Sequence, residues 1–200
     1  MFYTTADGHP FEHNPLTAIV SPRPIAWIST RSADGVDNLA PHSLYNLTAY
    51  APPQLMFSST MTKPDQTRGK DTLANIEATG VFAISTTEYA AREAVNASSG
   101  GFAKDVDEFA AVGIAKAECR TIDCPFVADA PATFECRLDR VIDLPGQQNY
   151  VVLGFIEAVH LRDDCIVDGR FEVKTYKPLA RLGYLDFAFV GDTFEMPRPG

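Results

Sequence analysis

The stretch from Ser21 to Thr48 constrains the fold most, because it contains two β-like runs that flank a short polar turn. The turn centres on Asp34-Gly35, a dipeptide that is a typical signal of a β-hairpin. Hydroxyl and amide groups on a rigid hairpin can approach the edge of a flat polar ligand more closely than long charged side chains can. The small polar residues of the two runs are Ser29, Thr30, Ser43, Asn46 and Thr48.

The composition describes an ordinary globular chain with an acidic balance. Its 200 residues are 46% hydrophobic and 22% charged, which is enough apolar material for the core of one domain. The net charge of −9 excludes nucleic acid as an expected partner, because neutralising phosphates needs a basic surface. The same charge argues against adsorption to an anionic membrane. A small anionic ligand is still compatible with the chain wherever positive side chains gather locally.

The sequence shows neither a membrane span nor a leader, and we therefore expect a cytoplasmic protein. It has no run of about 18 apolar residues, and its first ten residues lack a basic region followed by an apolar one. The four cysteines form no C-x-x-C pair and have no histidines at zinc spacing, which favours free thiols and no metal site. These cysteines are Cys119, Cys124, Cys136 and Cys165.

Most of the chain has the patterns of β-strands. Strands are predicted over residues 25–30, 39–50, 54–60, 81–85, 114–120, 132–142 and 150–161. A short helix is predicted over residues 73–79 and ends at Gly80, and further helices are predicted over residues 87–97 and 105–111. Helices thus gather in one part of the chain, which predicts a mainly β barrel decorated with short helices.

The sequence Lys70-Asp71-Thr72 at the start of the first predicted helix is a candidate anion site. A helix start presents unpaired backbone N–H groups and a partial positive charge, to which Lys70 adds a full charge. Lys63 and Arg68 lie in the preceding loop and make this region locally basic. The plainer alternative is an ordinary N-cap with polar loop residues around it. Nearby hydroxyl donors are Ser58, Ser59 and Thr72.

Ordered motifs run through the chain: Pro22–Thr30, Asn38–Asn46, Pro52-Pro53, Lys70–Asn75, Val159-His160 and Pro178–Tyr184. Together they resemble the flavin reductase-like family, whose members are FMN-binding split β-barrel proteins of Greek-key type. The resemblance extends from about residue 14 to residue 184. It implies one domain over residues 1–200, with a core over residues 14–184 and a helical insertion over about 87–111.

The resemblance also implies a homodimer with FMN near the dimer interface. It places the isoalloxazine ring and ribityl chain near Ser29, Thr30, Ser43 and Asn46. It places the phosphate near Ser58, Ser59, Lys70, Asp71 and Thr72. His160 and Arg181 are the candidate catalytic residues: His160 could approach the flavin or the nicotinamide, and Arg181 could hold the nicotinamide's pyrophosphate. The plainer alternatives are a strand-end histidine and an arginine that pairs with Asp186.

The function that the resemblance implies is reduction of FMN by NADH or NADPH, with hydride transfer to flavin N5. Electrons or reduced flavin would then pass to a monooxygenase or another acceptor. One alternative is an FMN-binding electron-transfer or carrier module without its own NAD(P)H site, and another is a ligand-binding barrel without redox function. The sequence has no G-x-G-x-x-G fingerprint after a strand, which is compatible with all three.

Overall fold

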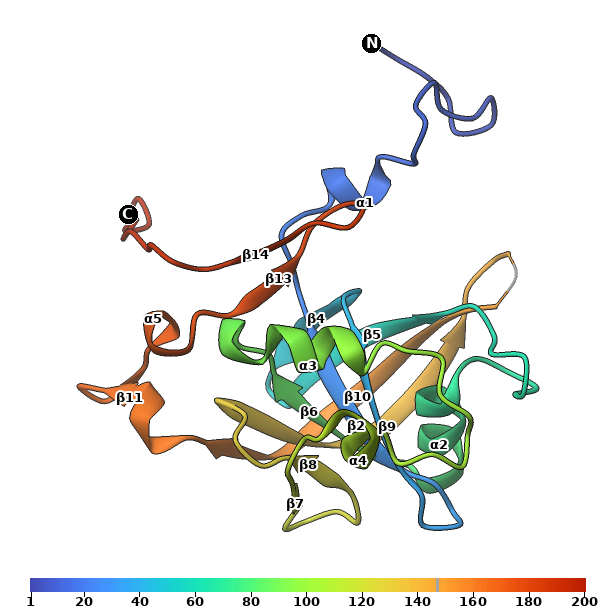
Figure 1. The fold of residues 1–200 in the computed structure, drawn as a ribbon. Helices are drawn as coiled ribbons and strands as arrows, with labels where there is room; N and C mark the ends of the chain where they lie inside the picture. The colour runs from blue at the N-terminus through green and yellow to red at the C-terminus, as the bar shows by residue number, and fades with distance from the viewer. Residues whose placement is uncertain (147) are drawn as a thin grey trace.

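The computed structural model describes residues 1–146 and 148–200 (Figure 1). Its helices are α1 (Leu16–Ile19), α2 (Asp71–Thr79), α3 (Arg92–Ala97), α4 (Glu108–Val112) and α5 (Val173–Tyr176), with 3-10 turns η1 (Tyr89–Ala91) and η2 (Asp163–Cys165). The first strands are β1 (Arg23–Pro24), β2 (Ala26–Arg31), β3 (Asp37–His42), β4 (Tyr45–Tyr50), β5 (Pro53–Thr60), β6 (Val81–Thr86) and β7 (Lys116–Glu118). The later strands are β8 (Pro125–Val127), β9 (Ala132–Asp143), β10 (Asn149–Leu161), β11 (Ile166–Val167), β12 (Arg170–Phe171), β13 (Leu179–Arg181) and β14 (Phe187–Phe189).

The main body is an antiparallel seven-stranded sheet with the order β3-β2-β6-β9-β10-β5-β4. Its two edge strands are neighbours in the chain, because β3 ends at His42 and β4 begins at Tyr45. The sheet must therefore curl until its edges approach each other. No ladder joins β3 to β4 within the described residues, so the barrel is split at this point. This confirms the prediction of a mainly β, split-barrel protein with short helices.

The predicted hairpin is present as β2 and β3, with Thr30 opposite Asn38. Gly35 has a φ of +83° in the turn, which explains why glycine follows Asp34. The predicted strand over residues 39–50 is wrong in one respect, because the structure breaks it at Ser43 into two strands on opposite edges. The local sequence offers no turn signal there, since the break follows from the curl of the whole sheet.

The core fills the inside of the curled sheet. Alternate residues of the strands point inward, including Ile28, Phe57 and Phe82, and all three are fully buried. Helix α2 closes this core with Leu73 and Ile76, which are also fully buried. The predicted end of this helix is confirmed: Gly80 adopts the left-handed conformation, and its N–H donates to the Ile76 carbonyl oxygen at 2.8 Å.

Helices α3 and α4 cover the outer face of β2 and β3. Trp27 is 1% exposed in a second cluster with Val95 and Phe109, and its indole Nε1–H donates to Ser98 Oγ at 2.9 Å. This tryptophan is therefore part of the core and forms no stacking platform for a ligand. The predicted helices over residues 87–97 and 105–111 correspond to η1 with α3 and to α4.

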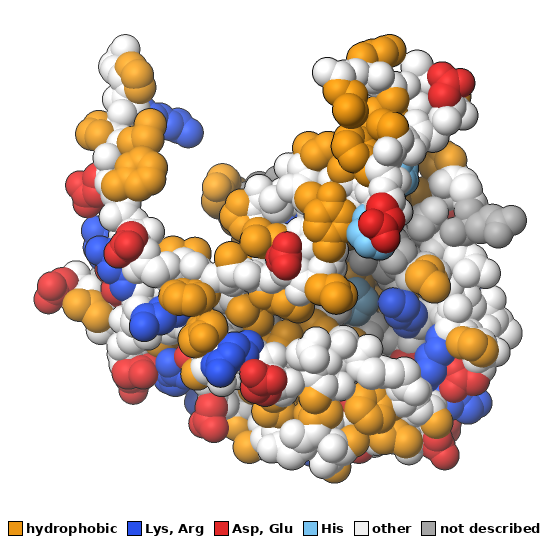
Figure 2. Space-filling view, turned by 45° about the horizontal axis from the view of Figure 1, so that its top comes forward, with side chains coloured by type: hydrophobic (Ala, Val, Ile, Leu, Met, Phe, Trp, Pro, Cys, Tyr) orange, Lys and Arg blue, Asp and Glu red, His pale blue; other side chains and the backbone are white. Residues whose placement is uncertain are grey.

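Both ends of the chain leave the barrel. Strands β1, β13 and β14 form a separate three-stranded sheet beside α1, and the two termini extend beyond it as arms (Figure 1). Figure 2 shows hydrophobic side chains on both arms and in the hollow between them. None of the described helices combines the length and the apolar character that crossing a bilayer requires.

Candidate functional site

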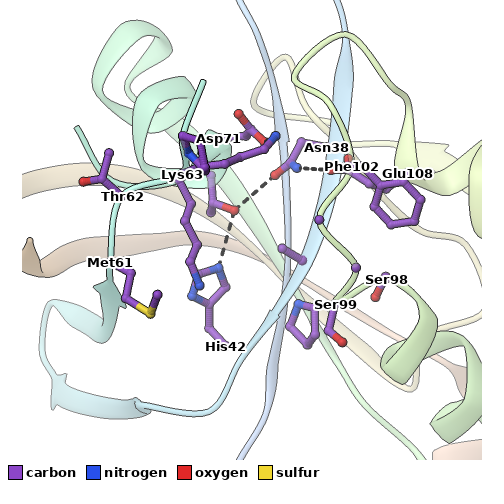
Figure 3. A pocket seen from close by; sticks show the side chains of 17 residues that line it. Asn38, His42, Met61, Thr62, Lys63, Asp71, Ser98, Ser99, Phe102 and Glu108 are labelled. Atoms are coloured by element: carbon purple, nitrogen blue, oxygen red, sulfur yellow. Dashed lines mark hydrogen bonds and ion pairs between the residues drawn. The ribbon is translucent and has the colours of Figure 1, made fainter. Parts of the chain in front are cut away.

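A cavity of about 340 Å³ lies where the split in the barrel meets the N-terminus of α2. We call it the α2 cavity. Its walls come from β3, from the loop that precedes α2, and from the segment that joins α3 to α4 (Figure 3). The lining residues used below are Asn38, His42, Lys63, Lys70, Asp71, Thr72, Ser99, Phe102 and Glu108.

Asn38 organises the polar side of this cavity. Its Oδ1 accepts hydrogen bonds from Thr72 Oγ1 at 3.1 Å and from Thr30 Oγ1 at 3.3 Å. Its Nδ2 donates to Glu108 Oε1 at 2.7 Å. His42 Nε2 lies 3.4 Å from Thr72 Oγ1. The network joins β2, β3, α2 and α4, so that one asparagine connects residues from four elements (Figure 3).

His42 is a neutral wall of the cavity at ordinary pH. Its exposed fraction is 8%, and burial, followed by the nearby charge of Lys70, lowers its pKa to about 4. The ring packs edge-on against Phe57, with 5.0 Å between ring centroids. Because His42 stays uncharged, it leaves the local positive charge to Lys70. The side chain faces the α2 cavity (Figure 3).

The three basic residues of the predicted cluster have different partners. Lys63 Nζ pairs with Asp71 and lies 3.5 Å from Asp65. Arg68 Nη2 lies 2.5 Å from Asp143 Oδ1, and its Nε lies 3.1 Å from Glu77. These two cations are therefore neutralised by carboxylates. Lys70 is exposed and has no carboxylate partner among the described residues, so it carries the free positive charge of this region.

The first turn of α2 faces the cavity without a side-chain cap. Lys70 occupies the N-cap position in an extended conformation, and its side chain makes no capping hydrogen bond. Gly69, before it, has a φ of +67°, and a Cβ there would lie 2.5 Å from Leu73 Cδ2. Only glycine thus allows the loop to approach the helix so closely. The Asp71 carboxylate, by contrast, accepts hydrogen bonds from Lys63 Nζ and Gln66 Nε2. These contacts hold the loop that precedes α2 against the start of the helix.

A second cavity of about 320 Å³ adjoins the first and shares Pro41, His42 and Lys70 with it. We call it the arginine cavity. Along β5, Ser58 and Thr60 face this cavity, whereas Ser59 points to the core and is fully buried, and its Oγ has no hydrogen-bond partner among the described residues. The remaining polar lining is Thr17, Arg23, Ser43 and Arg181.

The other predicted site residues lie in different places. Ser29 is buried, and its Oγ donates to the Pro125 carbonyl oxygen at 2.7 Å. Thr30 is buried too but belongs to the Asn38 network. Asn46 is exposed on β4, where its Oδ1 accepts the N–H of Leu47 at 2.8 Å.

His160 belongs to a separate network. Its Nε2 lies 2.5 Å from Oε1 of Glu135, a fully buried carboxylate, and its ring packs on Phe126. Neither cavity described above includes His160 in its lining. Arg181 does line the arginine cavity, and its Nη1 donates to the Asp186 carbonyl oxygen at 3.4 Å. For His160, the alternative of a strand-end histidine therefore fits the structure better than a position in the flavin groove.

The structure adds residues to the site that sequence reasoning did not single out as ligands. Asn38 lies within a motif noted above, but its role depends on contacts with α2 and α4. Glu108 is 70 positions from Asn38 and has no local signal. Arg23 lies within the motif Pro22–Thr30 and Thr60 within the predicted strand over residues 54–60, but neither was named as a site residue. An alternation rule applied to β5 would have separated Ser58 and Thr60 from Ser59.

Solved structures share this fold over almost the whole chain. A 2-nitrobenzoate 2-nitroreductase of Pseudomonas fluorescens is 27% identical, with a TM-score of 0.86 over 100% of this chain and 96% of that one. Component B of the nitrilotriacetate monooxygenase of Bacillus cereus is 26% identical, with a TM-score of 0.87 over 98% of both chains.

A putative flavin reductase with a split-barrel domain, from Shewanella frigidimarina, is 20% identical, with a TM-score of 0.85 over 100% of both chains, and shows the fold alone. The model of the flavin reductase like domain matches residues 20–176 of this chain. That match includes the curled sheet, the split edge and α2. The chain therefore belongs to the flavin reductase-like family of split-barrel proteins.

Proposed function

We propose that this protein binds FMN across the α2 cavity and acts as an FMN-dependent oxidoreductase that oxidises NADH or NADPH. The observation that carries the proposal is Lys70, a lysine without a carboxylate partner among the described residues, at an uncapped helix N-terminus beside the split in the barrel. In a chain of net charge −9, such a place favours a small anion.

The residues present fit the phosphate end of FMN. The N–H groups of the first turn of α2 suit phosphate oxygens, and Lys70 supplies a charge for a dianion. Ser58 and Thr60 supply hydroxyl donors on the neighbouring cavity wall. Lys63 and Asp71 brace each other and the loop, so the helix start is held in place before a ligand arrives.

The ring end of FMN would lie along β3 and the turn that follows it. Pro41 and His42 form an uncharged wall, and Phe102, from the segment that joins α3 to α4, also lines the α2 cavity (Figure 3). Bound FMN supplies the redox chemistry, since its ring takes up hydride from a reduced nicotinamide and passes electrons to an acceptor. The chain's own contribution would be to hold the ring edge against the uncharged wall of Pro41 and His42 and to leave one ring face open.

The names of two neighbours support this reaction class. One is a nitroreductase and the other is a component of a monooxygenase, and both are above 25% identical to this chain. In our proposal, NAD(P)H reduces the flavin of this protein, and a small oxidised acceptor or a partner monooxygenase receives the electrons or the reduced flavin.

We also propose that the working form is a homodimer. Large apolar side chains are exposed beside the arginine cavity, where an apolar surface would otherwise face water. A second copy of the chain is the occupant that the proposal names, and sedimentation velocity over a range of concentrations tests it. A monomer at every concentration would contradict it. The exposed residues include Leu16, Ile19, Val20, Phe187 and Phe189.

The binding test compares FMN with riboflavin, which lacks the phosphate. Lys70→Ala should weaken FMN binding by about 1–3 kcal/mol and leave riboflavin binding unchanged, because it removes a charge-assisted contact to phosphate. Lys174→Ala, on the exposed end of α5, is the matched control. Equal FMN affinity in wild type and Lys70→Ala would place the phosphate elsewhere.

The activity test separates a reductase from a carrier. FMN-loaded protein is mixed with NADH or NADPH in a stopped-flow spectrometer, and the loss of the oxidised flavin absorbance is followed. Fast bleaching by either nucleotide supports the proposal. Tight FMN binding with no bleaching would instead indicate an electron carrier that depends on a partner for reduction.

A further inference from the structure

Two cysteines face each other at the closed end of the hairpin formed by β7 and β8. The ladder of this hairpin pairs Glu118 with Pro125, so the next pair along it is Cys119 opposite Cys124. The Cys119 N–H donates to the Cys124 carbonyl oxygen at 3.0 Å and extends the ladder to this pair. Both thiols are free in this structure. The hairpin lies on the side of the barrel away from the two chain termini (Figure 1).

The register of the hairpin suits a bond between the two sulfur atoms. Residues directly opposite each other in an antiparallel ladder have their side chains on the same face, and in a hydrogen-bonded pair their Cα atoms lie about 5.5 Å apart. Disulfides join cysteines whose Cα atoms are roughly 4.4–6.8 Å apart. The packing agrees, because Cys124 belongs to a buried cluster with Val81 and Ala83, and Cys119 packs against that cluster.

The two thiols differ in their access to solvent. Cys119 is half-buried, whereas Cys124 is 0% exposed and its Sγ donates to the Ser29 carbonyl oxygen at 3.2 Å. The neighbouring thiol of Cys119, followed by burial, raises the pKa of Cys124. A buried, protonated thiol reacts slowly with a reagent from solution. Cys119 is therefore the thiol that an oxidant reaches first, and Cys124 is placed to react with it afterwards.

The other two cysteines lack such an arrangement. Cys136 is fully buried in the main core, where β9 pairs it with Phe82 on one side and Ile156 on the other. Cys165 is buried at the end of the turn η2, beside Asp164. Within the part of the chain that the structure describes, neither lies opposite another cysteine in a ladder. The fold therefore singles out one pair among four thiols.

We propose that Cys119 and Cys124 form a reversible oxidation site, at which a hydroperoxide such as hydrogen peroxide converts the two thiols into a disulfide across the hairpin. The proposal goes beyond the proposed function and does not depend on it, because the oxidant can be supplied from solution. Exposed dithiols of this kind cycle between the two states, since thiol reductants reopen the bond.

The oxidation takes place in two steps. The thiolate of Cys119 attacks one oxygen of hydrogen peroxide, the O–O bond breaks, and the products are a sulfenic acid on Cys119 and hydroxide, which leaves as water with the proton that the thiol gave up. The sulfur of Cys124 then attacks the Cys119 sulfur. The S–S bond forms, the S–O bond breaks, and the oxygen leaves as water with the Cys124 proton. Two thiols thus lose two electrons, and one peroxide becomes two waters.

The disulfide closes the turn without releasing it from the barrel. Glu118 and Asp123 hold Arg31 of β2 at 2.9 Å and 2.6 Å, and these ion pairs involve no sulfur. The one contact of the turn that oxidation removes is the hydrogen bond from Cys124 Sγ to Ser29. The oxidised protein should therefore stay folded, which a reversible site requires.

The first test maps the bond in wild-type protein. The purified protein is reduced, freed of reductant, treated with hydrogen peroxide, blocked with N-ethylmaleimide and digested with trypsin. Trypsin cuts after Arg120, so the disulfide should join the peptides 117–120 and 121–137. Two thiols per chain should escape blocking, dithiothreitol should restore both, and the melting curve should show a folded protein in both states. Because peptide 121–137 also contains Cys136, fragmentation of the linked pair identifies which cysteine is bonded.

The second test uses three single variants and requires melting curves that show folded protein. Cys124→Ala should give no linked peptide and should accumulate a sulfenic acid on Cys119 that dimedone traps. Cys119→Ala should slow the oxidation of Cys124 by about tenfold or more, because the buried thiol then meets peroxide alone. Cys136→Ala is the matched control, since it removes the other thiol of the same peptide, and it should oxidise as wild type does.

A bond from Cys119 to Cys136 or Cys165, or to a second copy of the chain, would overturn the proposal. So would a Cys119 that peroxide carries to the sulfinic acid while Cys124 stays free. Wild-type protein whose four thiols all remain open to blocking after peroxide treatment would contradict it as well.

Discussion

Glu108 and Glu135 are both buried carboxylates, but their surroundings shift their pKa values in opposite directions. Glu135 accepts the backbone N–H groups of Arg120 and Thr121, each at 2.7 Å, as well as the Thr121 hydroxyl and His160. Burial alone would raise its pKa, but these donors outweigh it and lower the pKa to about 2. Glu108 accepts hydrogen bonds from Asn38 Nδ2 and the Leu39 N–H, but here burial outweighs these donors and raises the pKa.

The difference distinguishes a structural carboxylate from one that lines a binding groove. Glu135 lies away from both cavities. Four donors stabilise its negative charge, and those from Arg120 and Thr121 attach the loop that precedes β8 to strand β9. Glu108 lies in the wall of the α2 cavity and has fewer donors, so its charge is less favourable. A groove must keep polar groups available for a ligand, whereas a structural contact can use all of them.

The largest expected effect comes from removing the structural carboxylate. Glu135→Ala leaves two backbone N–H groups and a hydroxyl without their acceptor, and should lower the free energy of unfolding by on the order of 3–5 kcal/mol. Urea unfolding monitored by fluorescence measures it. Glu157→Ala, which removes a partly exposed ion pair with Arg137, should cost less than about 1 kcal/mol. Equal losses in both variants would contradict the comparison.

The lowered pKa of His42 predicts that the folded protein loses stability in mild acid. Its pKa is about 4 when folded and 6.5 when unfolded, so the unfolded chain binds the proton first as the pH falls. Stability should therefore decline by up to about 3 kcal/mol as the pH falls from about 6.5 to about 4. His42→Gln should flatten this part of the profile, as urea titrations at several pH values would show. An unchanged slope would mean that His42 has the same pKa in the folded and the unfolded chain.

Glu108 should show the opposite dependence on pH. A raised pKa means that the folded protein holds this proton more tightly, so the contribution to stability is present below the unfolded pKa and is lost as the pH rises through the folded one. Glu108→Gln should remove that decline and change the free energy of unfolding at neutral pH by about 1 kcal/mol or less. The same titrations, run on this variant, check the sign. A steeper decline would show that another group causes it.

The smallest effects distinguish the two faces of β5. Ser59→Ala removes a buried hydroxyl that no described residue pairs with, and should leave stability unchanged or raise it by less than about 1 kcal/mol, with no change in FMN affinity. Ser58→Ala, on the face that lines the arginine cavity, should weaken FMN binding and leave the melting curve unchanged. If Ser59→Ala weakened FMN binding instead, the assignment of the two faces would be reversed.

The elements that sequence patterns predicted well are those defined by neighbouring residues. The hairpin at Gly35, the helix that Gly80 ends, and the long strands β9 and β10 all depend on local turn chemistry or on alternation. The short strands β13 and β14 carried no such signal, because β13 forms by pairing with the distant strand β1, and β14 forms by pairing with β13. The break at Ser43 was missed for a related reason, since it exists only because the sheet curls.

The predicted site residues also fall into two groups: those that a local pattern placed correctly, and those whose surroundings depend on distant parts of the chain. Lys70 and Thr72 were predicted from the start of a helix, and both line the α2 cavity. Ser29 was named from the hairpin and the family resemblance, and His160 from the resemblance, but their side chains face partners elsewhere, Pro125 and Glu135. A one-residue alternation decides which face of a strand a side chain takes, and the partner on that face comes from a distant part of the chain.

The sequence by itself determined the strands, the hairpin, the helix start and the family that the ordered motifs indicated, because each depends on residues close together in the chain. Only the tertiary structure decided which cations are free. Arg68 is neutralised by Asp143, 75 positions away, whereas Lys70, two positions from Arg68, has no such partner among the described residues. Charge compensation acts through space, so the folded arrangement of distant carboxylates selects the residues that remain to bind an anion.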